Sequence, residues 1–540
     1  MRALLVYAQF PKTYWGIEYG LRIAGKRASL PPLGLVTMAA VLPSAWRLRL
    51  VDMNVQSLDD EALQWADVVL VGGMHIQGDS MREVIRRAHA LGKRAVVGGP
   101  GPTTAPETFP EADAIFGGEV EGREAELLAL IEAQRPAAHA PAGEQRRVDL
   151  DKSARPDVKR SPVPRYELLR MQEYTSMSVQ YSRGCPFTCE FCDIIEIFGR
   201  LPRMKTPAQV LGELDRLYEL GWRGSVFVVD DNFIGNLREV RKLLPELTAW
   251  QRARGTPYEL YTEASVNLAK ETEVVAQMVT AGFSSVFLGI ETPSGVSLAA
   301  AKKRQNLKLD LVEAVDMLTR AGLEVMGGFI VGFDTDDVGA FEIQREFLAD
   351  APIPLAMIGM LTALPGTALW RRLGAEGRLR TGFMGDAFGR PNFVTAMDEE
   401  TLLSGYAALM RELYSVEGYL RRCMAYLERT PVRASSPRLR AGWERILLRS
   451  VWHLGVKSPR RRIFWALLTK VLRRSPGHVA WAFEKAIQGE HFLRYTQEDV
   501  LPMVERALAA VRRERASGVA PTAAPTPAPP RMRFALPIAT

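Results

Sequence analysis

The chain has 540 residues, 47% of them hydrophobic, and a formal charge of +7, which predicts a globular protein of about two to four domains. No stretch reaches the roughly 18 uninterrupted apolar residues that a membrane-spanning helix needs, and the apolar run at the N-terminus is too short for a signal peptide. Four cysteines are too few for a disulfide framework in so long a chain, so we expect a cytoplasmic protein with free thiols.

The first 133 residues alternate between strand-like and helix-like patterns. Short buried strands are predicted at 2–7, 47–52, 67–73, 94–100 and 113–119, and helices at 31–42 and 79–92. This alternation predicts a Rossmann-like, doubly wound α/β domain over 1–133, whose ligands bind beyond the carboxyl ends of the strands. The Gly-rich strand ends "VGGMHIQG" (71–78) and "VGGPGPTT" (97–104) are candidate ligand loops. Tight turns between strand and helix explain these glycines equally well.

Residues 134–165 are rich in Pro, Ala and charge, and they are predicted to be a linker. Over 166–384 the alternation resumes, with strands predicted at 176–181, 225–231, 258–264, 285–291, 324–332 and 355–361 and helices at 208–221 and 310–322. Six βα units in succession predict a partial (β/α)6 TIM barrel, with its chemistry at the carboxyl ends of the strands. Carboxylates stand at three of these ends and predict a polar ligand with amine and hydroxyl groups: Asp230, Asp231, Glu263 and Glu291.

The segment "RGCPFTCEFCDI" (183–194) follows the first strand of this unit and contains three of the four cysteines, spaced C-x3-C-x2-C. A structural zinc site is filled by four Cys or His ligands, but the nearest histidines are His139 and His453, and Cys423 is remote. The spacing therefore favours a [4Fe–4S] cluster held by Cys185, Cys189 and Cys192. Its fourth iron would be open to a small molecule.

Residues 385–512 are predicted to form a helical, basic domain, followed by a disordered Pro/Ala tail at 513–540. The stretch 458–476 has the pattern of an amphipathic basic helix, with clustered arginines around Ile463, Phe464, Leu467, Leu468, Val471 and Leu472. Such a helix suits an anionic membrane surface, and packing of its apolar face on the barrel is the alternative. No nucleic-acid-binding motif is present, so no nucleic acid is expected as a partner.

With Phe191 just before the third cysteine, the C-x3-C-x2-C loop resembles the radical S-adenosylmethionine (SAM) superfamily. The resemblance implies that SAM binds the open iron and is cleaved to a 5′-deoxyadenosyl radical. It also implies that Asp230 or Asp231 holds the SAM amino group and that Glu263 and Glu291 contact the ribose and methionyl parts. "GFIVG", from Gly328 to Gly332, would lie beside the adenine.

The first 133 residues resemble the cobalamin-binding domain of a large branch of that superfamily, through "VVGGPGPTTAPE" (96–107) and "ADAIFGGEVEG" (112–122). The resemblance implies cofactor contacts at Gly98, Gly99, Thr103 and Glu119. Asn54 stands at the histidine position of the cobalt-ligating motif D-x-H-x-x-G, so cobalamin is expected without histidine ligation from that loop. The loop 74–77 would lie near the lower face of the corrin, where His75 either contacts cobalt or forms a hydrogen bond.

The order of these regions resembles the cobalamin-dependent radical SAM group that includes the hopanoid methylases. This implies an enzyme in which the radical removes hydrogen from an unactivated carbon and methylcobalamin donates the methyl group, with a small molecule or lipid, such as a hopanoid, as substrate. A ferredoxin or flavodoxin would supply electrons, and the protein could associate peripherally with the inner membrane surface. A cobalamin-dependent cyclase or rearrangement enzyme and a non-enzymatic cobalamin sensor remain alternatives. A methylthiotransferase would need further cysteines before Cys185.

Overall fold

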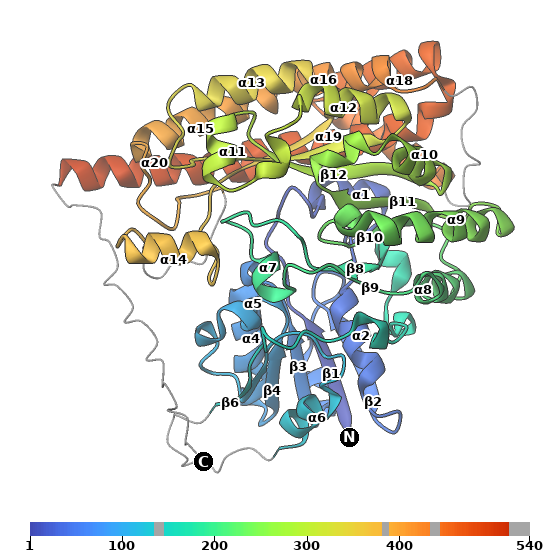
Figure 1. Ribbon diagram of the computed structural model, residues 1–540, viewed down its shortest axis with the longest axis vertical. Coiled ribbons are helices and arrows are strands. Elements are labelled where there is room, and N and C mark those ends of the chain that lie inside the picture. Colours follow the sequence, from blue (N-terminus) through green and yellow to red (C-terminus); the bar gives the residue numbers. More distant parts are fainter. Residues whose placement is uncertain (134–144, 381–387, 433–442, 518–540) are drawn as a thin grey trace, which may run out of the picture.

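The computed structural model describes residues 1–133, 145–380, 388–432 and 443–517. Two parallel β-sheets stand one above the other in Figure 1, and a layer of helices from the C-terminal region covers the upper sheet. The carboxyl ends of the lower strands point towards the upper sheet, because the N-terminus lies at the bottom of β1. The predicted α/β architecture with a helical C-terminal region is confirmed.

The lower sheet contains six parallel strands in the order β2-β1-β3-β4-β5-β6. Their bounds are β1 Arg2–Tyr7, β2 Arg47–Asp52, β3 Val68–Gly72, β4 Arg94–Gly98, β5 Ala114–Phe116 and β6 Arg146–Val148. Strands buried on both faces read as continuous apolar runs, and β1 has such a run. β2 is an edge strand in which exposed Arg47 and Arg49 alternate with leucines. Both strands begin and end at the predicted residues.

Helices cover both faces of this sheet. α2 (Leu33–Val41) and α6 (Glu124–Glu132) pack on one face, while α3 (Asp60–Trp65) and α4 (Gly78–Ala90) pack on the other. The side chains of successive strand residues therefore pack into two different cores, one on each face of the sheet. The sheet is doubly wound, as predicted.

The segment predicted to be a linker is more ordered than its composition suggests. Within 145–165, β6 pairs in parallel with β5 and extends the sheet by one strand. Its residues Arg146, Arg147 and Val148 carry no apolar run, because β6 is an edge strand with an exposed face. Residues 134–144 lie outside the described part of the chain.

The upper sheet is an open, six-stranded parallel barrel in the order β14-β13-β12-β11-β10-β7. The strands are β7 Ser176–Val179, β10 Ser225–Val228, β11 Glu259–Ala264, β12 Phe283–Glu291, β13 Glu324–Val331 and β14 Leu355–Met360. Each lies within two residues of a predicted strand at its start. The outer helices are α8 Pro207–Glu219, α9 Leu237–Ala253, α10 Thr272–Thr280, α11 Gly295–Ala300, α12 Leu311–Ala321, α13 Ala340–Asp350 and α14 Ala368–Ala375.

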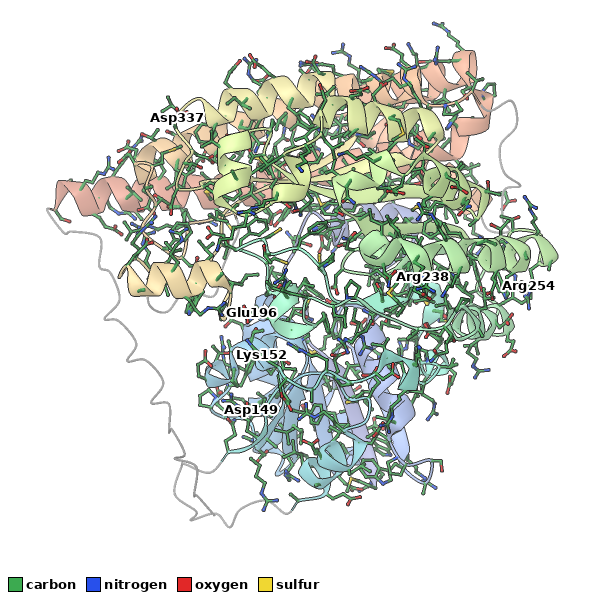
Figure 2. All side chains as sticks on the ribbon, viewed as in Figure 1. Asp149, Lys152, Glu196, Arg238, Arg254 and Asp337 are labelled. Atoms are coloured by element: carbon green, nitrogen blue, oxygen red, sulfur yellow. The ribbon has the colours of Figure 1, made fainter. Side chains whose placement is uncertain are left out.

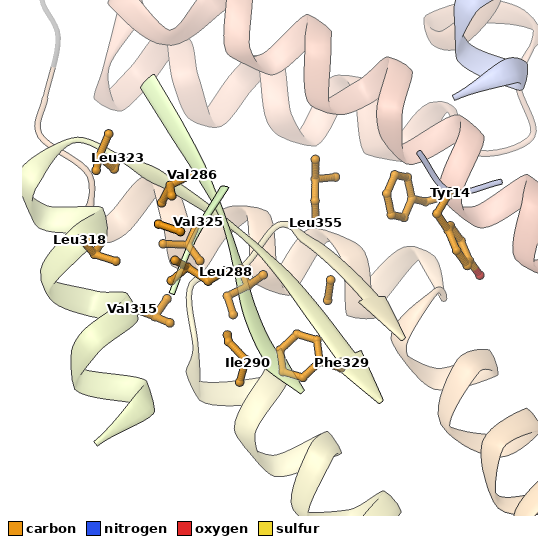
Figure 3. Close-up of a cluster of buried hydrophobic side chains, with 14 of the residues drawn as sticks. Tyr14, Val286, Leu288, Ile290, Val315, Leu318, Leu323, Val325, Phe329 and Leu355 are labelled. Atoms are coloured by element: carbon orange, nitrogen blue, oxygen red, sulfur yellow. The ribbon is translucent and has the colours of Figure 1, made fainter. Parts of the chain in front are cut away.

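The barrel core lies between the strands and these helices. Figure 3 shows Val315 and Leu318 of α12 against Val286 and Leu288 of β12 and Val325 of β13, and all five are fully buried. In β11, β12 and β13, several alternate residues face the inside of the barrel and are only partly buried. The barrel therefore has a packed outer face and a more open inner face.

The C-terminal helices pack against the barrel helices and against each other. They are α15 Glu399–Leu413, α16 Val416–Arg429, α17 Trp443–Ser450, α18 Arg461–Arg474, α19 Val479–Tyr495 and α20 Leu501–Ala516. A π-helical segment, Val451–Lys457, continues α17. Because α20 runs to Ala516, residues 513–516 of the predicted tail are helical, and 518–540 lie outside the described residues. Among the described residues, no helix is long and apolar enough to cross a membrane.

The apolar face predicted for 463–472 is largely buried. Ile463, Phe464, Leu467 and Val471 pack in the core with α16 and α19, and Leu472 is exposed. This face therefore is not available to a membrane. Amphipathic spacing alone does not distinguish a helix that packs on protein from one that packs on lipid.

Candidate active site

The cysteine loop is closed at its base by a short antiparallel hairpin. β8 (Ser182–Arg183) pairs with β9 (Arg203–Met204). Gly184 has φ +97°, and a Cβ there would lie 2.9 Å from the Gly199 carbonyl oxygen, so only glycine fits. The Cys185 N–H donates to the Gly199 carbonyl at 3.2 Å. Both ends of the loop are thus fixed to each other.

The three cysteines of the loop are free thiols in a poorly solvated place. Burial raises the pKa of Cys185 and of Cys192, and repulsion by the neighbouring cysteines adds to the rise. Buried thiolates need a positive partner, which iron would supply. Within the described residues no three His, Cys, Asp or Glu side chains converge on one ion position.

Asp230 and Asp231 lie beneath the start of the cysteine loop. Asp230 accepts hydrogen bonds from the Tyr181 N–H at 2.7 Å and the Ser182 hydroxyl at 2.6 Å, and Asp231 accepts from the Gly184 N–H at 2.8 Å. Burial raises the pKa of Asp230 to about 6 and that of Asp231 to about 7. Both predicted residues therefore also fasten the loop that carries the cysteines.

Glu263 is the last residue but one of β11, at the same mouth of the barrel. Burial raises its pKa to about 8, and the negative charges of Asp231 and Asp230 add to this rise. Three carboxyl groups that repel each other in a poorly solvated site favour a bound cation. The arrangement suits the ammonium or sulfonium group of a ligand.

Glu291 ends β12 in an unusual backbone conformation. Its φ is +65°, and the pairing of β12 with β13 shifts register between Gly289 and Glu291. Such bulges and left-handed non-glycine residues redirect side chains and cluster at functional sites. The Glu291 carboxylate forms a buried ion pair with Lys303. A Cβ on Gly289 would collide with both groups.

Lys303 and Gln305 were not predicted from the sequence, yet they lie at the cysteine loop. Burial lowers the pKa of Lys303, but the negative charges of Glu291 and Cys189 outweigh this effect and raise it overall. The Gln305 side-chain N–H donates to Cys189 Sγ at 3.6 Å. No motif marks these residues, because their position depends on how the segment after α11 folds back. The Lys303 ammonium also lies 5.9 Å from the Phe191 ring.

The glycines of "GFIVG" have two different roles. A Cβ on Gly328 would lie 2.6 Å from the Phe287 ring, so glycine leaves room for that ring on the inner face of the barrel. Gly332 has φ +96°, and its N–H donates to Asp336 at 2.9 Å. Trp15, which the sequence analysis did not single out, contacts Phe287 edge to face at 4.7 Å between ring centroids.

The glycine loops of the lower sheet are packed tightly against one another. Gly99 has φ +100°, and a Cβ there would lie 2.8 Å from the Gly73 carbonyl oxygen. A Cβ on Gly98 would lie 3.2 Å from the Phe116 carbonyl oxygen. The Thr103 hydroxyl, on α5 (Pro100–Thr104), accepts from the Gly118 N–H at 3.0 Å. The loops after β3, β4 and β5 therefore form one rigid edge, the glycine edge, at the carboxyl ends of the strands.

His75 and Asn54 are both engaged with protein atoms. The His75 Nε2 is hydrogen-bonded to the Thr104 hydroxyl, and burial lowers the pKa of His75, so the ring is neutral near pH 7. Its neighbours Met74 and Ile76 are exposed at the edge of the sheet. Asn54 accepts from the Phe10 N–H at 2.8 Å and donates to Asp52 at 2.7 Å. These contacts hold the loop after β1 to the loop after β2.

Glu119 lies at the junction of the two sheets. It forms ion pairs with Arg183 and Arg203 of the cysteine-loop hairpin, and Glu121 forms a second pair with Arg183, all at 2.8 Å. Both Glu119 oxygens accept hydrogen bonds from guanidinium groups, so Glu119 links the two sheets. No local sequence pattern marks Arg183 or Arg203, because their glutamate partners come from the other sheet.

The two predicted cofactor regions are neighbours in space. α5, from the lower sheet, lies against α7 (Ile194–Ile197), which follows the third cysteine. Figure 2 labels Lys152 and Glu196 at this junction, where they form an ion pair, and Arg371 of α14 pairs with Glu196 at 2.9 Å. The glycine edge and the cysteine loop therefore border a common region between the sheets.

Family models match the chain in the same three regions. Residues 24–128 match a B12 binding domain, residues 179–343 match the radical SAM superfamily, and residues 367–501 match a domain of unknown function. The order is the one that the fold shows.

Two curated relatives match nearly the whole chain. An uncharacterized methyltransferase of Synechocystis sp. is 42% identical over 506 residues, with 92% of each chain covered. The hopanoid C-2 methylase of Rhodopseudomonas palustris is 35% identical over 508 residues, covering 92% of this chain and 94% of the relative.

Solved structures share the fold. The cobalamin-dependent SAM radical enzyme OxsB superposes with a TM-score of 0.58 at 15% identity, covering 96% of this chain and 81% of OxsB. The radical SAM methyltransferase TsrM from Kitasatospora setae superposes with a TM-score of 0.54 at 17% identity, covering 70% of this chain and 76% of TsrM.

Proposed function

The chain belongs to the B12-binding radical SAM family, and on this premise we propose that it methylates an unactivated carbon of a hopanoid or a related lipid. The observation that carries the proposal is the shared region between the cysteine loop and the glycine edge, in a chain similar over its length to methyltransferases. Anaerobic turnover with SAM and a hopanoid, followed by mass spectrometry of the lipid, tests it.

The chemistry requires three cofactors that act together. An unactivated carbon has no acidic proton, so acid–base methylation is unavailable to it. When bound, the [4Fe–4S] cluster and SAM supply a carbon radical, and cobalamin supplies the methyl group. The protein then has to hold these groups in register and keep water away from them.

We assign the holding of the cluster to Cys185, Cys189 and Cys192, with the Gln305 hydrogen bond to Cys189 as support. Asp231 and Glu263 supply negative charge for the SAM ammonium group, and Lys303 supplies positive charge beside Cys189 for its carboxylate. Met74 and Ile76 supply an apolar edge for the lower face of the corrin, and neutral His75 donates to or accepts from Thr104. The rigid glycine edge holds these three residues in place.

We further propose that a ferredoxin or flavodoxin reduces the cluster and that the enzyme works on the cytoplasmic face of the inner membrane. A cyclase or rearrangement enzyme would use the same cofactors, but its product would gain no carbon. A cobalamin sensor would make no use of the three loop cysteines.

The affinity for SAM should rise with pH through the titration of Glu263. At neutral pH the Glu263 carboxyl is mostly protonated in the ligand-free site, because its pKa is about 8. A bound cation favours the carboxylate, so affinity should increase from pH 6 until about pH 8 and then level off. The gain is about tenfold for each unit by which SAM lowers that pKa.

Glu263→Gln should bind SAM weakly and with a flatter pH dependence, as measured by anaerobic equilibrium dialysis. Glu246→Gln is the matched control, because it removes the same charge from an exposed position on α9. Equal pH profiles for Glu263→Gln and the unsubstituted protein would contradict the role of Glu263.

A further inference from the structure

We propose that the protein docks on an anionic lipid surface through an apolar stripe formed by Leu448, Trp452 and Val456. The proposal rests on the proposed function, since it says where a lipid substrate would be reached. α17 continues without interruption into the π-helical segment Val451–Lys457. The three residues are four apart along it, and their exposed fractions are 72%, 52% and 49%. Residues at this spacing share one helix face.

The stripe stands on a well-packed base. Trp465 of α18 is 44% exposed beside it, and its indole N–H donates to the Gly455 carbonyl at 2.9 Å. Leu454 on the opposite side is buried, and a Cβ on Gly455 would lie 3.1 Å from the buried Phe464 ring. The apolar residues of the stripe are therefore exposed on an ordered surface, which is unusual for a protein without a partner there.

The charges around the stripe favour an anionic bilayer over a protein partner. Residues 443–474 contain nine Arg or Lys and a single acidic residue, Glu444, and three of the nine basic side chains form ion pairs with glutamates of α16 and α19. Arg445, Arg449, Lys457 and Arg461 are exposed, and Lys457 lies 5.1 Å from the Trp452 ring centroid. Tryptophan with surrounding basic residues is typical of the membrane–water interface. Each basic residue near an anionic surface strengthens binding about fivefold.

A short segment joins this face to the inside of the barrel. α17 contacts α1 (Glu18–Ala24), and Gly25 at the end of α1 lies against Arg449. Trp15, three residues before α1, contacts Phe287 on the inner face of β12. A lipid taken up at the stripe would thus be close to a segment that reaches the barrel interior.

Vesicle sedimentation with the full-length protein tests the proposal. Leu448→Glu/Trp452→Glu should lower binding to vesicles of phosphatidylcholine and phosphatidylglycerol at least about tenfold, because it removes apolar area and adds negative charge. Lys457→Glu/Arg461→Glu should weaken binding as well, and high salt should weaken binding of the unsubstituted protein. Vesicles of phosphatidylcholine alone should bind poorly.

The matched control is Val338→Glu/Ile343→Glu. Both side chains are exposed, at 69% and 40%, and their neighbour Asp337 lies at the end of the molecule away from α18 (Figures 1 and 2). This variant adds the same charges and should bind vesicles like the unsubstituted protein. Thermal melts establish that all variants are folded.

Two results would overturn the proposal. One is vesicle binding that neither Leu448→Glu/Trp452→Glu nor Lys457→Glu/Arg461→Glu changes. The other is a concentration-dependent dimer, without lipid, that Leu448→Glu/Trp452→Glu abolishes, since the stripe would then be a subunit interface. Sedimentation needs neither SAM nor turnover, so failure of methylation with intact vesicle binding would count against the proposed function alone.

Discussion

Cys189→Ser should lose the iron–sulfur cluster and the cleavage of SAM together. Cys189 is the most buried of the three loop cysteines, with 8% of its surface exposed, and it receives the Gln305 hydrogen bond. Serine is a poor iron ligand because its hydroxyl ionises far less readily than a thiol. After anaerobic reconstitution we expect about four irons per chain in the unsubstituted protein and nearly none in the variant. Formation of 5′-deoxyadenosine should fall to background.

Cys423→Ser is the matched control for this experiment. Cys423 is fully buried in α16 and belongs to the core shared with α19. Its substitution should cost some stability but leave the iron content unchanged. Retained 5′-deoxyadenosine formation in Cys189→Ser would contradict the assignment of the cysteine loop.

Arg183→Met should destabilise the contact between the two sheets by about 3–5 kcal/mol, because it leaves Glu119 and Glu121 as buried carboxylates with less compensation. The Arg183 side chain also sits one residue before Gly184, so the cysteine loop should loosen. Urea unfolding of the cluster-free protein, followed by tryptophan fluorescence, measures the first effect. The iron content after anaerobic reconstitution measures the second.

The stabilising effect of Arg183 should disappear at low pH. Burial raises the pKa of Glu121, but the charge and hydrogen bonds of Arg183 lower it more, to about 2. A depressed carboxyl pKa stabilises the fold above the unfolded pKa of 4.5, and this contribution is lost as pH falls towards 2. The stabilities of Arg183→Met and the unsubstituted protein should therefore converge below about pH 4.5.

Arg2→Met provides the comparison, because Arg2 and Asp67 form an exposed ion pair within the lower sheet. Exposed pairs contribute little, so this variant should unfold at nearly the same urea concentration as the unsubstituted protein. An equal loss of stability in Arg2→Met and Arg183→Met would contradict the predicted importance of the inter-sheet ion pairs.

The parts of the fold that the sequence predicted are those with strong local signals. β1 was located to the residue because its apolar run is continuous, and β2 because leucines alternate with arginines along it. β6 was missed because Arg146 and Arg147 give no such run, and the two-residue strands of the β8–β9 hairpin are too short to have a period. The exposed stripe of α17 was missed because the pattern of α18 is more regular, although α18 turns its apolar side to the core.

The site was predictable where spacing along the chain decides the chemistry. Cys185, Cys189 and Cys192 are close in sequence, so their joint role follows from their spacing. Lys303 and Gln305 reach Cys189 only because the barrel brings a distant loop beside it. Glu119 stays predicted as a cofactor contact, but its ion-pair partners Arg183 and Arg203 come from the other sheet and were not predicted. Long-range ion pairs of this kind leave no local pattern.

The most direct test of the account is the mass of the lipid product. Reconstituted, cobalamin-loaded protein would be incubated anaerobically with a hopanoid, a reductant and SAM that carries a deuterated methyl group. We expect a product in which one deuterated methyl group replaces one hydrogen, with 5′-deoxyadenosine formed alongside. A product that loses hydrogen without gaining carbon, or SAM that is not cleaved, would contradict it.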